Sequence, residues 1–321
     1  MTVKSAIMFG GCLLSALFVY PKLIIFLKKI RYSQTISEYS LADYKQKEGT
    51  PTMGGLAFIF LPIIFIVFIY PSFYQDATMM LVIMVYLGYG LIGFIDDYII
   101  VIKHDNAGLK ASYKFLMQLA LSIVFYLIYR EYSVTTINIW FLNWSFDLGW
   151  VYALLVFFMF TGTSNAVNIT DGMDGLAAGT TILALIPFVV FAFIASKPYI
   201  AVFVIGVIGA LLGYLRYNLH PAKVFMGDVG SLALGGLLAG LALVLKQELS
   251  LIIVGGVFVY ETLCVIIQIT SVKLFKKKVF RYTPIHYSFV IQGMSEIKVV
   301  RMFWILGFLF MIFGLLIGVN V

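Results

Sequence analysis

Five aspartates stand where long apolar stretches begin or end. Asp96 and Asp97 close one stretch, Asp171 and Asp174 follow another, and Asp228 lies just before a third. A carboxylate held next to hydrocarbon is costly, so it usually marks a functional site. Two adjacent carboxylates repel unless a cation relieves them. Oxygen-rich clusters suit Mg²⁺, which substrate phosphates often complete. The aspartates therefore predict a magnesium-dependent site for a phosphorylated substrate, with Asp228 as a metal ligand.

A run of turn and capping residues, 165–175, separates two of the apolar stretches. Asn165, Asn168 and Asp171 recur at every third position, so they share one face if the segment is helical. Asp171 and Asp174 have the same spacing. Such a stripe offers polar groups to the edge of a base or a sugar. The same residues would also cap and break a helix.

Two further loops combine glycines with groups that bind ligands. In the stretch 218–231, Gly227 permits close backbone approach to a ligand, and Phe225 offers a ring for stacking. The stretch 47–55 places Lys47 and Thr52 before an apolar run, where a helix N-terminus would bind an anion. It is not a P-loop, because the spacing and the preceding strand are missing.

Two titratable residues near the carboxyl terminus have open interpretations. His286 follows the basic run 276–278, and a lone histidine is more often structural than catalytic. The basic run itself is typical of a topology signal and of contact with anionic lipid. Glu261 lies inside an apolar stretch, so it should face the interior of the bundle or a water-filled groove. A structural hydrogen bond and a substrate role are equally compatible with that position.

Composition decides the class of protein that must position these residues. Of 321 residues, 62% are hydrophobic and 12% charged, and the mean hydropathy is +1.02. Soluble domains carry about 25% charge, so the solvent of this chain is the lipid bilayer. Apolar runs of helix length, without the alternation of a barrel, predict helices. The net charge of +7 fits basic loops on one membrane face rather than nucleic-acid binding.

We therefore predict an all-α, polytopic integral membrane protein, with one domain over residues 1–321 and about ten transmembrane helices. Cys12 and Cys264 both lie in apolar runs and are interpreted as packing residues. The ten predicted spans are 6–27, 53–70, 78–95, 115–129, 148–167, 176–194, 199–217, 231–245, 249–274 and 299–319.

The basic residues orient these spans. Of the 22 lysines and arginines, all except Lys4, Arg130, Lys197 and Lys246 fall on the side of the loops after odd-numbered spans. Because basic loops stay in the cytoplasm, both termini are predicted to be extracytoplasmic. The five aspartates then line a cytoplasmic active-site cleft.

The motifs together resemble those of the phospho-N-acetylmuramoyl-pentapeptide transferases, within the wider polyprenyl-phosphate N-acetylhexosamine-1-phosphate transferases. The matching stretches run in family order and include the Gly-Thr-Pro-Thr-Met-Gly-Gly and Phe-Met-Gly-Asp-Val-Gly-Ser strings. They are 49–55, 93–97, 164–175, 217–236 and 261–286.

The resemblance implies a reaction, its partners and its location. UDP-N-acetylmuramoyl-pentapeptide gives its phospho-sugar to undecaprenyl phosphate, with lipid I and UMP as products, in the first membrane step of peptidoglycan synthesis. The enzyme would lie in the bacterial cytoplasmic membrane with its site facing the cytoplasm. Mg²⁺ would be the cofactor. The ninth span would be bent, which would suit a polar break around Glu261, and would line a groove for the lipid.

The resemblance also assigns roles to residues. Asp96, Asp97 and Asp228 would be catalytic, and Asp228 would bind the metal. The residues implied to bind substrate are Lys47, Thr52, Asn168 and Asp171 around the diphosphate, Asp174, Asn218 and Phe225 around the uridine, and Lys114, Asn165 and His286 elsewhere in the site.

The chain departs from the family pattern at two places. Ile100 stands where the family has a lysine three residues after the aspartate pair, and Lys114 is interpreted as replacing that charge. His286-Tyr287-Ser288 stands where the family favours three histidines. The contacts that the missing groups make in the family are therefore open, and the peptide part of the substrate is the least constrained.

Several alternatives stay open at this level. Asp96 or Asp97 could take a proton from the lipid phosphate, or one could be a nucleophile that forms a covalent intermediate. A sister enzyme that transfers N-acetylglucosamine 1-phosphate would share the aspartate motifs. A transporter would instead carry charges near the bilayer midplane. Gly236 and Gly240 have a spacing that permits close helix contact within one chain or in a homodimer.

Overall fold

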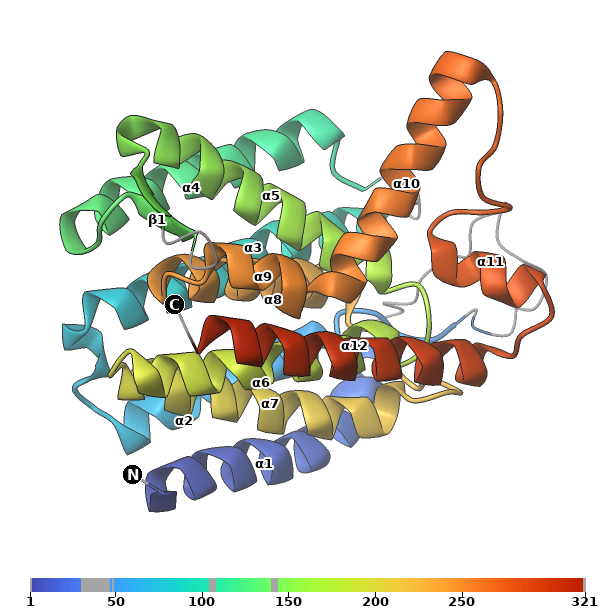
Figure 1. The fold of residues 1–321 in the computed structure, drawn as a ribbon. Coiled ribbons are helices and arrows are strands. Elements are labelled where there is room, and N and C mark those ends of the chain that lie inside the picture. The colour runs from blue at the N-terminus through green and yellow to red at the C-terminus, as the bar shows by residue number, and fades with distance from the viewer. Residues whose placement is uncertain (1, 30–46, 48, 104–107, 140–143, 320–321) are drawn as a thin grey trace.

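Long apolar helices build nearly the whole protein in the computed structural model (Figure 1). The structure describes residues 2–29, 47, 49–103, 108–139 and 144–319. Nine helices in these ranges are long and apolar enough to cross a membrane, and the shorter α2 is a further apolar helix. The prediction of an all-α polytopic membrane protein is therefore confirmed.

The elements follow one another with short connections. The helices are α1 (Thr2–Lys29), α2 (Gly55–Ile69), α3 (Ala77–Lys103), α4 (Ala111–Tyr132), α5 (Tyr152–Thr170), α6 (Leu176–Ile194), α7 (Pro198–Asn218), α8 (Gly227–Val244), α9 (Glu248–Val254), α10 (Gly256–Phe275), α11 (Ile285–Ile291) and α12 (Glu296–Gly318). The strands are β1 (Thr136–Ile139) and β2 (Trp144–Asp147), which pair antiparallel. Single turns of 3-10 helix, Phe73–Gln75 and Gly149–Val151, precede α3 and α5.

The structure differs from the predicted spans in four respects. The predicted span 249–274 is two helices, α9 and α10, which meet at Gly255. The β1–β2 hairpin and the short helix α11 were not predicted. α3 continues past Asp97 to Lys103, so the aspartate pair lies within a helix rather than at its end. α8 begins at Gly227, which places Asp228 in its first turn.

α8 is the central helix because its sequence is rich in glycine and alanine, whose small size lets neighbouring backbones approach. It is buried from Val229 to Val244 and packs along α3 and α5. Gly236 lies against the ring of Tyr89, and Gly240 lies against Val85, both on α3. The Gly236–Gly240 spacing therefore makes a contact within the chain.

The segment before α2, residues 51–54, holds the N-terminal end of α8 in place. We call this segment the strap. Phe225 N–H donates to the Pro51 carbonyl at 2.9 Å, and Gly54 N–H donates to the Phe225 carbonyl at 2.8 Å. Gly55 N–H donates to the Met226 carbonyl at 3.0 Å. The glycine-rich string is thus paired with the Phe-Met-Gly-Asp string through its backbone. Two motifs far apart in the sequence become one structural unit at this end of the bundle.

The four basic residues excepted above gather at the other end. Lys4 lies 3.9 Å from the centre of the Tyr70 ring, and Lys197 donates to Thr78 at 3.1 Å. Lys246 pairs with Glu248 at 2.6 Å. α1 begins and α12 ends at this same end (Figure 1). We call it the lysine-poor end, and the end that carries Asp97 and Asp228 the carboxylate end.

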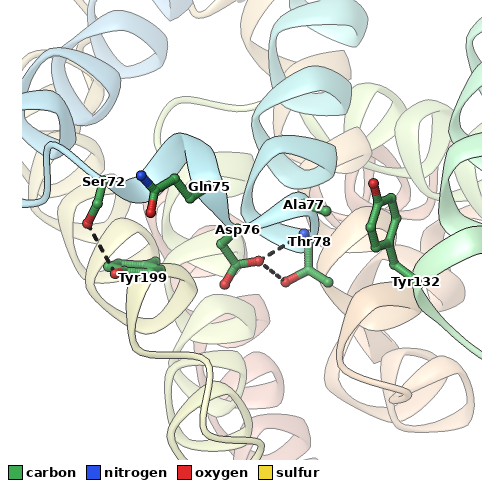
Figure 2. A pocket seen from close by; sticks show the side chains of 7 residues that line it. All are labelled: Ser72, Gln75, Asp76, Ala77, Thr78, Tyr132 and Tyr199. Atoms are coloured by element: carbon green, nitrogen blue, oxygen red, sulfur yellow. Dashed lines mark hydrogen bonds between the residues drawn. The ribbon is translucent and has the colours of Figure 1, made fainter.

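An open polar pocket of about 440 Å³ lies at the lysine-poor end (Figure 2). Asp76 caps α3 there, because its carboxylate accepts from Thr78 N–H at 2.9 Å and from the Thr78 hydroxyl at 2.6 Å. The Ser72 hydroxyl lies 3.3 Å from the Tyr199 hydroxyl across the pocket. These bonds hold the connection between α2 and α3.

α10 leaves the bundle and extends away from the other helices (Figure 1). Side chains on its outer half, such as Leu274 and Phe275, are largely exposed, as expected in contact with lipid. A groove of about 340 Å³ separates α5 from α9 and α10 and is lined almost entirely by apolar side chains. The bend that the resemblance implied for the ninth span is found at Gly255 and not around Glu261, which lies inside α10.

The contact between α3 and α8 yields a stability prediction. Gly93 lies against the Asp228 carbonyl so closely that an added methyl group would overlap the backbone. We expect Gly93→Ala to destabilise the protein by about 1–3 kcal/mol, as overpacking does, in thermal unfolding of the protein in detergent. Gly10→Ala is the matched control, since nothing lies within 4 Å of a methyl group there. Equal Tm values for both variants would contradict the described packing.

Candidate active site

Asp228 lies at the centre of the carboxylate end, in the first turn of α8. Its two carboxylate oxygens contact different helices. Asn168 of α5 donates its amide to Oδ1 at 2.6 Å, and Lys114 of α4 lies 2.5 Å from Oδ2. The Lys114 ammonium is also 3.8 Å from Oδ2 of Asp96 on α3. Three other helices, α3, α4 and α5, thus supply the groups around the Asp228 carboxylate. Asp96, Asn168 and Asp228, which the sequence predicted to share one site, lie together here.

Asp97 has a different role from its neighbour in the pair. Its Oδ1 accepts from Asp228 N–H at 3.1 Å, and its Oδ2 accepts from Val229 N–H at 3.1 Å. A carboxylate at the N-terminus of a helix satisfies free N–H groups and opposes the positive end of the helix dipole. Asp97 is 5% exposed. It therefore acts as a cap on α8, supplied by another helix, and fixes the position of Asp228.

Asp96 keeps one oxygen available to the site. Its Oδ1 accepts from Leu109 N–H at 2.9 Å, while its Oδ2 faces Lys114. Gly108, next to Leu109, has a positive φ of 55°. A side chain there would also crowd the Asp96 carboxylate. Both the positive φ and this close contact therefore favour glycine at position 108.

Asp171 ends α5 and makes no side-chain hydrogen bond or ion pair with the described residues. Burial raises the pKa of the Asp171 carboxyl well above its usual range, and the negative charges of Asp228 and Asp97 raise it further. Asp174 and Lys47 also act on it electrostatically. Asp171 thus lies between the Asp228 group and a second charged cluster, with no cation in contact of its own.

The arrangement fits a divalent cation. Four carboxylates, Asp96, Asp97, Asp171 and Asp228, influence one another, and Lys114 is the one cation in ion-pair contact with any of them among the described residues. A buried hydroxyl, Thr52 Oγ1, has no hydrogen-bond partner within the described part of the chain and lies beside Gly227 and Asp97. Oxygen ligands and an excess of negative charge are what Mg²⁺ prefers.

The second cluster is centred on Asp174. Lys47 lies 2.7 Å from Asp174 Oδ1 and 2.6 Å from Glu296 Oε1. Asp174 Oδ2 accepts from Ala222 N–H at 2.9 Å and is 3.1 Å from His220 Nδ1. Asp174, His220 and Glu296 are close enough together to hold a metal ion. However, the Lys47 ammonium contacts both carboxylates of this cluster, whereas Lys114 contacts only two of the four aspartates grouped with Asp228. The excess of carboxylates over cations is therefore larger at Asp228, which makes it the better position for a metal ion.

The sequence interpretation missed Glu296 and His220. Glu296 begins α12 and accepts from Asp174 N–H at 2.8 Å as well as from Lys47. Its place at the start of an apolar run was a signal of the same kind as that of Asp228. His220 lies two residues after Asn218 in the stretch 218–231, and the sequence prediction gave it no role.

Three predicted substrate-binding residues make contacts within the protein. Asn218 is 2% exposed; its Oδ1 accepts from Gly175 N–H at 3.0 Å, and its amide donates to the Val224 carbonyl at 2.9 Å. Asn165 donates to Thr161 of its own helix at 2.8 Å. Phe225 is half-buried, and its backbone N–H donates to the carbonyl of Pro51 in the strap. Their roles toward a substrate remain predictions.

His286 braces the loop that follows α5. Its Nδ1 lies 3.0 Å from Glu261 of α10, and Glu261 also accepts from Ile285 N–H at 2.9 Å. His286 is fully buried, and its Nε2 faces Gly172 so closely that a side chain at 172 would overlap it. Glu261 therefore has a structural role, which is one of the two interpretations left open by the sequence. His286 contacts Gly172, which follows Asp171, and so packs against the loop beside the site.

Comparison with known proteins identifies the family. Glycosyl transferase family 4 matches residues 78–246, and phospho-N-acetylmuramoyl-pentapeptide-transferase signature 1 matches residues 47–59. The phospho-N-acetylmuramoyl-pentapeptide-transferase of Staphylococcus haemolyticus is 46% identical over 314 residues, 96% of this chain and 97% of its own. Those of Geobacillus thermodenitrificans and Bacillus subtilis are each 45% identical, over 93% and 96% of both chains.

The chain belongs to the phospho-N-acetylmuramoyl-pentapeptide-transferase family. The family 4 match spans α3 to α8 and so contains Asp96, Asp97, Asp171 and Asp228. The transferase signature covers Lys47 and the strap against Phe225. His286 and Glu296 lie beyond both matches, in the part of this transferase that closes the site from α11 and α12.

The Lys47 cluster yields a prediction on folding. Lys47→Met leaves the buried Asp174 carboxylate without its closest cation, and removing one partner of a buried pair costs about 3–5 kcal/mol. Adding Asp174→Asn removes the unpaired charge, so we expect the double variant to be more stable than Lys47→Met alone. The measurement is Tm of the four proteins of this double-mutant cycle in detergent. Strictly additive losses would show that Lys47 and Asp174 do not interact.

Proposed function

We propose that this protein transfers phospho-N-acetylmuramoyl-pentapeptide from UDP-N-acetylmuramoyl-pentapeptide to undecaprenyl phosphate and releases UMP, with Mg²⁺ as its cofactor. The observation that carries the proposal is the convergence of Asp96, Asp97, Asp171 and Asp228 at one end of a membrane bundle whose family carries out this chemistry. A transferase of phosphates needs positive charge at such a site, and these side chains would hold it.

The chain's own residues divide the work of the reaction. Mg²⁺ held by Asp228, with Asp171 and Asp96 beside it, would neutralise the diphosphate and the departing UMP. Asn168 and Asp97 fix the Asp228 carboxylate and the first turn of α8. Lys114 adds a second positive charge for the phosphates. Catalysis then consists mainly of positioning and charge stabilisation.

Bond making and breaking occur at the phosphorus that carries the sugar. An oxygen of the lipid phosphate attacks it in line, the bond to the UMP oxygen breaks, and one phosphoanhydride replaces another. Asp96 is the better proton acceptor of the pair, because both oxygens of Asp97 accept backbone N–H groups and Asp96 keeps Oδ2 for the site. The second pKa of a phosphate is about 6, so this help is small at neutral pH.

The apolar groove between α5 and α10 is the proposed place of the undecaprenyl chain. Its lining includes Thr163 and Ala166, the turn of α5 that precedes Asn168, and Thr262, next to Glu261. The groove therefore leads from the bilayer toward the carboxylate cluster. A long isoprenoid in it would present its phosphate to Asp228 without crossing polar surface.

The proposed setting is the bacterial cytoplasmic membrane, with the carboxylate end facing the cytoplasm. UDP-linked sugars are made there, and the lysine-poor end would face outward under the positive-inside rule. The exposed basic residues Lys276, Lys277 and Lys278, beyond α10, lie on the proposed cytoplasmic side.

Product formation by the purified protein tests the reaction. With undecaprenyl phosphate in detergent, we expect UMP release from UDP-N-acetylmuramoyl-pentapeptide, abolished by EDTA and restored by Mg²⁺. UDP-N-acetylglucosamine should react about 100-fold more slowly, since a site built for polar groups of one substrate rejects another. Faster reaction of UDP-N-acetylglucosamine would instead identify the sister activity.

In the same assay, Asp228→Asn should lose more than ~100-fold in kcat, whereas Asp76→Asn at the opposite end should not.

A second prediction concerns the lipid groove. Gly162 lines it and has open space beside it, so Gly162→Trp should fill the groove without disturbing the bundle. We expect KM for undecaprenyl phosphate to rise about tenfold while KM for the nucleotide substrate stays unchanged. Gly10→Trp is the control, because Gly10 also faces open space but on α1, away from the groove. Equal effects on both substrates would place the lipid elsewhere.

A further inference from the structure

A second apolar groove, of about 500 Å³, lies on the other side of the bundle, where α12 and α7 flank α6. Leu212 and Leu215 of α7 form one wall, and Trp304, Ile305 and Phe308 of α12 form the other. Gly179, Ile182 and Leu183 of α6 form its floor. The first groove is lined by α5, α9 and α10, so the two are separate sites.

One charged side chain lines this second groove. Arg301 of α12 is exposed and makes no hydrogen bond or ion pair with the described residues. Among the residues that the structure describes, no carboxylate lines the groove. Arg216 of α7 is also exposed but does not line the groove, and its guanidinium lies 5.9 Å from the centre of the Tyr217 ring. An arginine without a partner next to hydrocarbon is unfavourable unless it meets an anion or water.

The position of Arg301 along α12 indicates how deep its backbone lies in the bilayer. Glu296, at the start of α12, contacts Lys47 and Asp174 at the carboxylate end. Arg301 lies about 7 Å further along the helix, and Phe308 about 10 Å beyond Arg301, at 1.5 Å per residue. Half of a bilayer's hydrocarbon core is about 15 Å thick. The groove therefore covers one leaflet, with Arg301 near the head groups, which its long side chain reaches.

The wall of the groove is rigid at its centre. The Trp304 indole N–H donates to the Gly175 carbonyl at 3.2 Å, in the loop that follows Asp174. Gly179 packs against the same ring so closely that a side chain there would overlap it. Trp304 thus has one fixed orientation and presents a preformed apolar surface rather than a collapsed one.

We propose that this groove binds an anionic phospholipid of the leaflet at the carboxylate end. One acyl chain lies between α7 and α12 over the α6 floor, and the head-group phosphate pairs with Arg301. Charge complementarity selects this occupant: a zwitterionic lipid fills the groove equally well but offers Arg301 no net charge. A second copy of the chain would have to bring a carboxylate to Arg301 from an apolar, lipid-facing surface.

Trp304 provides the probe. Trp144 and Trp150 belong to the hairpin region at the lysine-poor end. A Trp140→Phe, Trp144→Phe, Trp150→Phe background leaves Trp304 as the single tryptophan. This protein is placed in bilayers of phosphatidylcholine with increasing brominated phosphatidylglycerol, or with brominated phosphatidylcholine. Bromine quenches tryptophan on contact, so the two curves give the relative binding constant of the two lipids.

We expect phosphatidylglycerol to be preferred about fivefold, which corresponds to the ~1 kcal/mol that one basic side chain contributes beside anionic lipid. Arg301→Gln should bring the ratio close to one. Lys273→Gln, an exposed charge in the last turn of α10, is the matched control and should leave the preference unchanged.

Three results would overturn the proposal. Equal quenching by both lipids, or a preference that survives Arg301→Gln, would show that Arg301 selects no anionic lipid. Absence of quenching by either lipid would show that a protein surface covers the groove. The measurement needs no transferase turnover, so its outcome is independent of the proposed function.

Discussion

The capping of α8 by Asp97 is the interaction on which the rest of the site depends. Asp97 belongs to α3, yet both its oxygens bind the first N–H groups of α8, at Asp228 and Val229. The absence of a side chain at Gly93 lets the two helices come close enough for these bonds. A helix N-terminus pointing into a membrane protein would otherwise carry unsatisfied N–H groups. The bond that satisfies α8 therefore also positions Asp228.

The position of α8 then determines what surrounds it. α5 brings Asn168 to one oxygen of Asp228, and α4 brings Lys114 to the other. The strap before α2 pairs with Phe225 and Met226, and so carries Thr52 to the same place. The carboxylates at this point outnumber the cations that the described residues bring into contact with them. Lys47 is engaged by Asp174 and Glu296, which leaves Asp171 for a cation from solution.

The sequence was sufficient for the class of fold and for several residues that lie together at the carboxylate end. Composition and apolar run length predict the helices, because lipid leaves few alternatives for the backbone. Asp96, Asn168, Asp171 and Asp228 were predicted to meet, and their contacts or electrostatic coupling bring them together. Helix ends were less predictable. α8 starts earlier than its apolar run because Asp97, distant in sequence, supplies its cap.

Some distinctions could not be made from sequence. Asp96 and Asp97 are chemically identical neighbours, and only the direction in which each faces along α3 separates a cap from an available carboxylate. Glu296 and His220 reach Asp174 through the packing of α12 and α7 against α6, which no local pattern encodes. The break at Gly255 arises where α10 leaves the bundle; the resemblance implied a bend in this span, but the single apolar run did not indicate its position.

The central claim is that Asp228, and not the Asp174 cluster, holds the divalent cation. Crystals of the protein grown with Mn²⁺ in place of Mg²⁺ test it directly, because manganese gives an anomalous signal that locates the ion. The account predicts one peak within about 2.5 Å of an Asp228 oxygen, on the side facing Asp171. A peak between Asp174, His220 and Glu296, with Lys47 displaced and none at Asp228, would contradict it.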